Sequence, residues 1–201
     1  MTSFEYVRYY MALLVVAFVP GAFLFWFVVH PFVPFWRRVG YGWAYTLGLT
    51  VVTGVAVTLF AMRDALLTVE FGTSAVTVAV GAPLIVSSSV LRRKWGKHLR
   101  LRTLWGLPEL APERHESRLL SDGIYARVRH PRYLEMLLGV AGWAFVSNYL
   151  AAYAVTVYTM VMLALLIPLE ERELVQRFGP AYEDYRRRVP ALLPRLRRRV
   201  Y

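Results

Sequence analysis

The chain has 201 residues, of which 57% are hydrophobic, and a formal net charge of +11. This apolar content excludes an ordinary soluble domain of this size. The chain contains no cysteine, which excludes disulfides, thiolate metal sites and a cysteine nucleophile. It also lacks a glycine-rich nucleotide loop and an HExxH zinc motif, so we expect no bound metal.

Three long stretches without a charged residue predict membrane-spanning helices in the first part of the chain. About 20 mainly apolar residues are needed to cross the hydrocarbon core of a bilayer. The stretches place spans at roughly Tyr9–Val29, Tyr41–Ala61 and Gly72–Val90. The first span lacks the basic start and the small-residue cleavage pattern of a signal peptide, so we expect a retained anchor.

A fourth charge-free run extends from Met136 to Leu169 and is too long for one span. The sequence "SNY" at Ser147–Tyr149 interrupts it with residues that favour a turn. The run therefore predicts a helical hairpin, whose first helix begins at Pro131. We expect an all-α polytopic membrane protein with about five transmembrane helices, of which the two hairpin helices are the shortest.

The segment after the hairpin predicts two further helices outside the bilayer. An amphipathic helix is expected from Pro168 to about Phe178, followed by a break at Gly179 and Pro180. A short helix is then expected from Ala181 to Arg188. We treat this as a cytoplasmic, helical C-terminal segment.

Basic residues gather at three places that five spans put on the same side of the membrane. They are Arg37–Arg38, the stretch "RRKWGKHLRLR" from Arg92, and the tail "RRRVPALLPRLRRRV" from Arg186. The positive-inside rule predicts a multi-pass protein of the cytoplasmic membrane with its C-terminus in the cytoplasm. The same charges suit anionic membrane lipids, and we expect no nucleic-acid partner.

The stretch "RVRHPRYLEMLL", from Arg127 to Leu138, places Arg129 and His130 at the start of the hairpin. Free backbone N–H groups at a helix start favour an anion, so we expect an anion site there. The returning helix should bring Glu170 and Glu171 close to His130. Arg129 could also pair with one of these carboxylates merely to close the hairpin.

These residues resemble a known family. "GIYARVRHPRYLEMLL", the turn at Asn148 and "EERELVQRFGPAYEDYRRRVPALLP" are similar to the C-terminal half of the integral-membrane methyltransferases that include isoprenylcysteine carboxyl methyltransferase and phospholipid N-methyltransferases. The resemblance covers about Gly123 to Pro194. Its motifs occur in the family's order, with Arg129, His130, Pro131 and Tyr133 in the R-H-P-x-Y element.

The resemblance implies S-adenosylmethionine as the cofactor, held between the cytoplasmic segments and the hairpin. The cofactor-binding residues that it implies are Tyr125, Arg129, His130, Pro131, Tyr133, Glu170 and Glu171. Their chemistry fits, because guanidinium or imidazole can hold the methionine carboxylate and glutamate can pair with the α-amino group. As catalytic candidates we select Arg129 and Glu135, and Glu135 departs from the glycine that the family often has at this position.

The expected function is S-adenosylmethionine-dependent methyl transfer to a lipophilic small-molecule or lipid acceptor, similar to isoprenylcysteine carboxyl methyltransferase. One alternative is a phospholipid amine N-methyltransferase. Another is a non-catalytic lipid-binding membrane scaffold. For an enzyme, we expect residues 1–91 to form a transmembrane scaffold and residues 92–201 to form the catalytic region.

Overall fold

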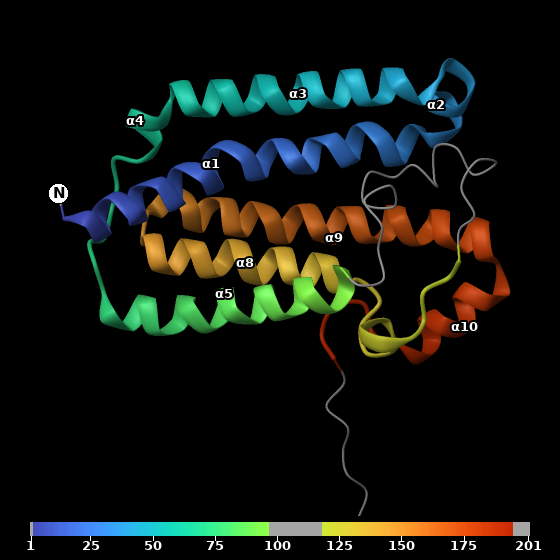
Figure 1. Cartoon of the computed structure of the whole chain (residues 1–201). Coiled ribbons are helices and arrows are strands. Elements are labelled where there is room, and N and C mark those ends of the chain that lie inside the picture. Colours follow the sequence, from blue (N-terminus) through green and yellow to red (C-terminus); the bar gives the residue numbers. More distant parts are fainter. Residues whose placement is uncertain (1, 97–117, 195–201) are drawn as a thin grey trace, which may run out of the picture.

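The long helices of the protein run side by side along one common direction (Figure 1). The computed structural model describes residues 2–96 and 118–194, and within these ranges every regular element is helical. The basic stretch from Lys97 to Arg102 and the tail from Arg195 lie outside the described residues. The elements in chain order are α1 (Ser3–Val29), η1 (His30–Phe32), α2 (Val33–Val39), α3 (Tyr41–Ala61), α4 (Arg63–Leu66), α5 (Ala75–Gly96), η2 (Gly123–Ala126), α8 (Pro131–Ser147), α9 (Leu150–Phe178) and α10 (Pro180–Arg188).

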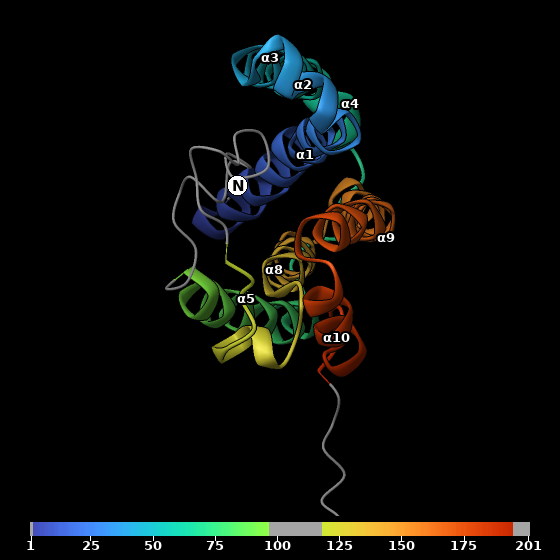
Figure 2. The same cartoon turned by 90° about the vertical axis from the view of Figure 1, so that its right-hand side faces the viewer.

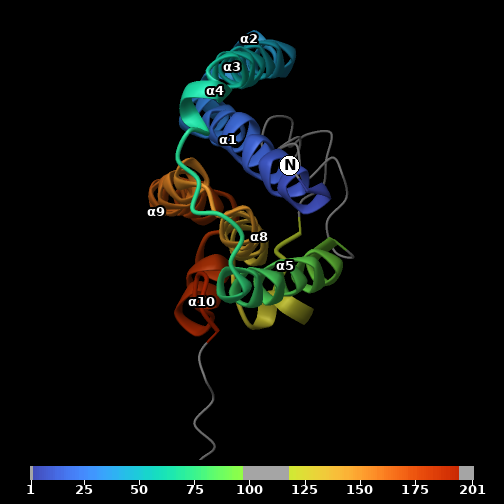
Figure 3. The same cartoon turned by 90° about the vertical axis from the view of Figure 1, so that its left-hand side faces the viewer.

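Helix α1 joins two groups of helices. Views along the bundle show α1 beside α3 in one group, and α8 between α5 and α9 in the other (Figures 2 and 3). Helix α1 contacts α3, α8 and α9. Its contribution to the main apolar cluster includes Phe23, Trp26 and Val29, which pack with Leu163 and Leu166 of α9.

Four helical stretches are long and apolar enough to cross a membrane. They are Ser3–Val39, Tyr41–Ala61, Ala75–Gly96 and Leu150–Phe178. Large apolar side chains such as Trp43 and Val57 are exposed on α3, as a lipid-facing surface requires. The prediction of an all-α polytopic membrane protein is therefore confirmed. Helix α8, the remaining predicted span, has 17 residues, which corresponds to a length of about 26 Å.

The first residues of two helices differ from the predicted ones, because local backbone and capping interactions set where these helices begin. Helix α1 begins at Ser3 rather than Tyr9, because Thr2 and Glu5 form a capping box around its first turn. Helix α5 begins at Ala75 rather than Gly72, which has a φ of +74° that a right-handed helix does not allow. A stretch without charged residues therefore predicts the apolar part of a helix but not the residue at which the helix begins.

Asn148 makes the predicted turn of the hairpin. It adopts a left-handed conformation with φ 59° and ψ 43°, and its backbone N–H donates to the carbonyl of Ala144. Its side-chain nitrogen donates to the carbonyl of Gly72 at 2.9 Å, and its side-chain oxygen accepts from the Tyr153 hydroxyl at 2.8 Å. The turn is therefore fixed both by α9 and by the segment before α5.

The returning arm and the predicted amphipathic helix form one continuous element. Helix α9 passes through Pro168 and ends only at Phe178, since a proline inside a membrane helix is tolerated when neighbouring groups satisfy the freed backbone. The predicted break is present at Gly179, whose φ of +55° and ψ of −136° suit glycine. Helix α10 then starts at Pro180, close to the predicted position.

Helices α5 and α8 approach closely because glycines face each other between them. A Cβ atom on Gly142 would lie 2.7 Å from Cγ1 of Ile85 and 2.9 Å from the carbonyl oxygen of Gly81. A Cβ atom on Gly139 would lie 3.0 Å from the Ser88 hydroxyl. Small residues of this kind let membrane helices pack backbone against backbone.

A Gly142→Ala substitution is therefore expected to destabilise the protein by about 1–3 kcal/mol, because the added methyl forces α5 and α8 apart. Thermal unfolding of the purified protein in detergent measures the effect. Gly54→Ala is the matched control, since a Cβ at Gly54 meets nothing within 4 Å. Alanine there should be neutral or slightly stabilising, because it favours helix more than glycine does. Equal melting temperatures for the two variants would contradict the proposed contact.

A buried arginine organises the end of the bundle that carries the N-terminus and the hairpin turn. Arg8 is 1% exposed. Its Nε donates to the carbonyl of Ser147 at 2.9 Å, and its Nη1 donates to the Thr73 hydroxyl at 3.1 Å. Its Nη2 lies 3.6 Å from the Glu70 carboxylate. Arg8 thus binds α1 to the last carbonyl of α8 and to the segment before α5.

Candidate active site

The candidate site lies at one end of the bundle. There the N-terminal end of α8 meets the last turns of α9 and the segment after α10 (Figure 1). Pro131 is the first residue of α8, where a proline removes no helix hydrogen bond, and His130 is the N-cap. The backbone N–H of Arg129 donates to the carbonyl of Pro190 at 2.9 Å, and that of His130 donates to Ala191 at 3.0 Å. The 189–191 segment is thereby bound to the entrance of α8.

These bonds change the expectation of an anion site made by backbone N–H groups. The N–H groups of Arg129 and His130 are bonded to the 189–191 segment, and those of Tyr133 and Leu134 donate to the carbonyl of His130 at 3.1 and 3.2 Å. None of these four amides is available to an anion. An anion at this place therefore cannot depend on these four amides.

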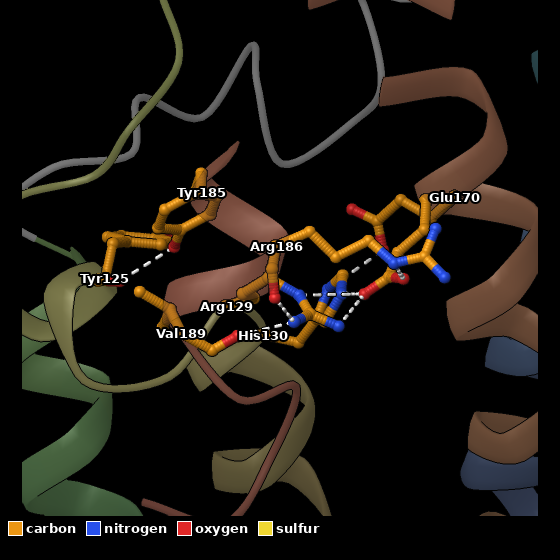
Figure 4. A network of polar contacts seen from close by, with 8 residues as sticks. Tyr125, Arg129, His130, Glu170, Tyr185, Arg186 and Val189 are labelled. Carbon is orange, nitrogen blue, oxygen red and sulfur yellow. Dashed lines mark hydrogen bonds and ion pairs between the residues drawn. The ribbon is translucent and has the colours of Figure 1, made fainter. Parts of the chain in front are cut away.

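Arg129 connects α8 to α9 and α10 (Figure 4). Its Nε and Nη2 donate to Oε1 of Glu171 at 2.9 and 2.5 Å. Its Nη1 donates to the carbonyl of Arg186 at 2.9 Å and to that of Val189. The Arg129 and Glu171 side chains are only 10% and 8% exposed. Arg129 therefore meets Glu171, one of the two returning glutamates, which is also the pairing expected if it merely closes the hairpin.

His130 lies between both returning carboxylates. Its Nε2 is 3.1 Å from Oε1 of Glu171, and its Nδ1 is 3.5 Å from Oε2 of Glu170. Burial by itself would lower the pKa of His130, but the interactions with the Glu170 and Glu171 carboxylates outweigh burial and raise that pKa to about 9. The Tyr133 ring stacks on the imidazole with 5.5 Å between ring centroids. His130 is therefore a cation at neutral pH.

Tyrosines enclose the other side of the cluster. The Tyr185 hydroxyl donates to the carbonyl of Tyr125 at 2.7 Å, which joins α10 to η2 (Figure 4). The Tyr125 ring is buried, and burial together with the negative charge of Glu170 raises the pKa of its hydroxyl. Tyr182 is 1% exposed. Burial and the negative charge of Glu171 raise the pKa of its hydroxyl, and the charge of Arg129 opposes this increase. The cluster is therefore surrounded by neutral phenols.

Two buried polar atoms at the cluster have no hydrogen-bond partner within the described residues. They are Oε2 of Glu170, whose contact with His130 is the 3.5 Å ion pair, and the hydroxyl of Tyr182. A buried polar atom without a partner costs free energy, because it has lost its hydrogen bonds to water. Such atoms therefore indicate places where a ligand can form a hydrogen bond. The Glu170 oxygen suits an ammonium group, and the Tyr182 hydroxyl can donate to an acceptor atom.

Glu135 is the predicted site residue that the structure does not bring to this cluster. Its Oε1 accepts from the Ser88 hydroxyl at 3.3 Å and lies 3.3 Å from Nε of Arg92, so it faces α5. Two residues along a helix correspond to a rotation of about 200°. Tyr133 and Glu135 therefore lie on opposite faces of α8, and Tyr133 lies on the face of His130.

Sequence reasoning missed a second histidine beside the cluster. His30 Nδ1 lies 3.3 Å from Oε2 of Glu173, which is one turn beyond Glu170 on α9. The imidazole of His30 stacks on Trp26, and the guanidinium of Arg132 lies over the same indole. An imidazole at the end of an otherwise uncharged span was the signal that could have identified His30.

The profile of the family described as phospholipid methyltransferase matches residues 76–181, which is more than half of the chain. This range contains every predicted site residue. No solved structure matches the chain.

Three curated relatives are similar to parts of the chain. Methanethiol S-methyltransferase 2 of Bradyrhizobium diazoefficiens is 48% identical over 77 residues, and protein-S-isoprenylcysteine O-methyltransferase of Schizosaccharomyces pombe is 34% identical over 87 residues. Protein-S-isoprenylcysteine O-methyltransferase B of Arabidopsis thaliana is 32% identical over 115 residues. These alignments cover 36%, 42% and 57% of this chain, and 27%, 37% and 57% of the relatives. The chain thus spans about a quarter to just over half of the length of these relatives.

Proposed function

Because the chain belongs to the phospholipid methyltransferase family, we propose that it transfers a methyl group from S-adenosylmethionine to a lipophilic acceptor, as an isoprenylcysteine carboxyl methyltransferase-like enzyme. The observation that carries this proposal is the buried cluster of Arg129, His130, Glu170 and Glu171 at the entrance of the hairpin. It combines cations and carboxylates in one place, as the zwitterionic end of S-adenosylmethionine requires.

The residues present fit this cofactor. Oε2 of Glu170 is buried and has no hydrogen-bond partner in the described part of the chain, so it can accept from the α-amino group. The cationic His130 could hold the carboxylate if its Nδ1–H, which lies 3.5 Å from Glu170, donated to the cofactor instead, while Arg129 fixes Glu171. Tyr125 and Tyr133 offer aromatic faces beside the cluster, and Pro131 fixes the helix start. Bound S-adenosylmethionine supplies a methyl group on a sulfonium sulfur.

Methyl transfer requires mainly that the acceptor atom be aligned with the methyl carbon and that water be excluded. The burial of His130, Glu171 and Tyr182 provides exclusion of water on the protein side. A lipophilic acceptor can arrive laterally from the bilayer against the exposed apolar helices. By the positive-inside rule, we assign the α10 end of the bundle to the cytoplasm and the protein to the cytoplasmic membrane.

A phospholipid amine is the second candidate acceptor. The description of the matching family favours it, and carboxylates near the cofactor could attract an ammonium headgroup. A thiol is a third, because one of the similar proteins is a methanethiol S-methyltransferase.

Calorimetry on the purified full chain with S-adenosylmethionine tests the proposal. We expect saturable binding to folded protein, and binding that disappears in a His130→Ala variant. Membranes supplied with methyl-labelled S-adenosylmethionine then identify the acceptor class, since labelled phosphatidylethanolamine derivatives would favour the amine. A folded protein that binds no S-adenosylmethionine would contradict the function.

A further inference from the structure

A hollow lies at the corner where α2 leads into α3. It has a volume of about 360 Å³ and is lined by Val39, Gly40, Gly42, Trp43 and Thr46. Ligand sites have volumes of roughly 300–1,000 Å³, so the hollow is large enough for a small polar group. The corner lies at the same end of the bundle as α10 (Figure 1), which is the end that we assign to the cytoplasm.

Two glycines keep the hollow open. A Cβ atom on Gly40 or on Gly42 would meet nothing within 4 Å. Gly40 has a φ of +103°, and this backbone conformation accounts for the glycine there. Gly42 lies in the first turn of α3 and has no such requirement, although glycine favours helix less than alanine does. Backbone geometry and packing against the described residues therefore leave Gly42 without a reason, whereas an occupant of the hollow would give it one.

The hollow lies at the level of the lipid headgroups. Helix α3 has 21 residues, which corresponds to a length of about 31 Å and so to the roughly 30 Å hydrocarbon core of a bilayer. Its first residues therefore lie where the hydrocarbon core ends. Tyr41 and Trp43 are 38% and 67% exposed there, and exposed aromatic residues of these two types are typical of this level of a membrane. The bilayer itself can therefore supply the occupant.

The charges around the hollow favour an anionic headgroup. Arg37 and Arg38 end α2 directly before the lining residue Val39, and both are exposed. A guanidinium group forms charge-assisted hydrogen bonds to a phosphate. All five lining residues are uncharged, and the sequence from Val33 to Thr46 contains no aspartate or glutamate. The ammonium group of a choline or ethanolamine headgroup would therefore meet two cations and no carboxylate of this segment.

We propose that this hollow binds the headgroup of an anionic phospholipid, such as phosphatidylglycerol. Arg38 holds the phosphate at the mouth of the hollow, and the glycerol part fills the space beside Gly42. The acyl chains follow the exposed apolar side chains of α3, beginning at Trp43. Anionic lipids belong to the cytoplasmic leaflet, where this corner lies. The inference is independent of the proposed methyl transfer.

Lipid binding to the purified full chain in detergent tests the proposal. Native mass spectrometry with added phosphatidylglycerol or phosphatidylcholine, matched in their acyl chains, measures how much of each lipid stays bound. Wild-type protein should bind phosphatidylglycerol about tenfold more tightly, because a charge-assisted hydrogen bond without an opposing ammonium group contributes an amount of this order. Added salt should reduce the difference, since the arginines are exposed to solvent.

Two variants and a matched control locate the site. Gly42→Leu fills the hollow and should abolish the preference for phosphatidylglycerol. Arg38→Gln should reduce the preference to a similar degree, because the phosphate loses its donor and an ammonium group is no longer repelled. Gly54→Leu adds the same side chain elsewhere on α3, where a Cβ also meets nothing within 4 Å, and should leave the preference unchanged. All three variants should melt like wild-type protein.

Three results would overturn the inference. The first is equal binding of the two lipids, or tighter binding of phosphatidylcholine, by wild-type protein. The second is a preference for phosphatidylglycerol that survives in both Gly42→Leu and Arg38→Gln, which would place the lipid elsewhere. The third is displacement of phosphatidylglycerol by inorganic phosphate at equal concentration, which would show that the hollow binds a free anion rather than a lipid.

Discussion

Replacing Glu170 by glutamine is expected to weaken S-adenosylmethionine binding by about tenfold to a hundredfold. Oε2 of Glu170 is buried, and among the described residues it makes a 3.5 Å ion pair with His130 but no hydrogen bond. Hydrogen bonds to charged groups contribute about 1.5–3 kcal/mol, and each 1.4 kcal/mol is about tenfold in affinity. Glutamine keeps the shape of the side chain and removes its charge. Titration calorimetry on purified protein gives the affinities.

Two other carboxylates serve as comparisons for this prediction. Glu183→Gln changes an exposed residue of α10 and should leave the affinity unchanged. Glu171→Gln should instead lower the melting temperature, because Arg129 and His130 lose the carboxylate to which they are bonded. Equal affinities in wild-type protein and Glu170→Gln would show that Glu170 does not contact the cofactor.

An Arg8→Met substitution is expected to lower the free energy of unfolding by about 1–3 kcal/mol for each buried acceptor that loses its hydrogen-bond donor. Methionine fills a similar volume but donates no hydrogen bond. The carbonyl of Ser147 and the hydroxyl of Thr73 would lose their donor, and Glu70 would lose its cation. Unfolding of the protein in mixed detergent micelles measures the change.

Arg63→Met is the control at the same end of the bundle. The Arg63 side chain is 35% exposed, and its partner Asp64 is 82% exposed. Exposed pairs contribute about 1 kcal/mol or less, so this variant should unfold almost like wild-type protein. Similar losses in both variants would mean that burial of Arg8 does not matter. Because the site lies at the other end of the bundle, S-adenosylmethionine affinity should survive in Arg8→Met below its melting temperature.

The hairpin and the meeting of Arg129 and His130 with Glu170 and Glu171 could be predicted from the sequence, for a geometric reason. The turn at Asn148 lies about halfway between His130 and Glu170, and helical rise is constant, so the two ends must return to a similar depth. The predictions of an integral-membrane methyltransferase family and of an enzyme are confirmed. The roles of the individual site residues stay predictions.

Contacts between distant helices could not be predicted in the same way. The sequence indicates which face of a helix is apolar but not which helix covers that face. The pairing of His30 with Glu173 depends on how α1 packs against α9, and the direction of Glu135 depends on the close contact of α5 with α8. Likewise, nothing in the local pattern around Arg129 indicates that its backbone will bond to Pro190.

The hydrogen bonds from Arg129 and His130 to the carbonyls of Pro190 and Ala191 determine when the site can assemble during biosynthesis. The ribosome makes Arg129 and His130 long before these two carbonyls, and the hairpin can enter the membrane while the later segment is still being added. Until Ala191 has left the ribosome, the N–H groups of Arg129 and His130 lack their partners, and the Arg129 guanidinium lacks the Val189 carbonyl. A nascent chain therefore contains the charged residues of the site before it can assemble them, and the site is completed only after residues 189–191 have been made.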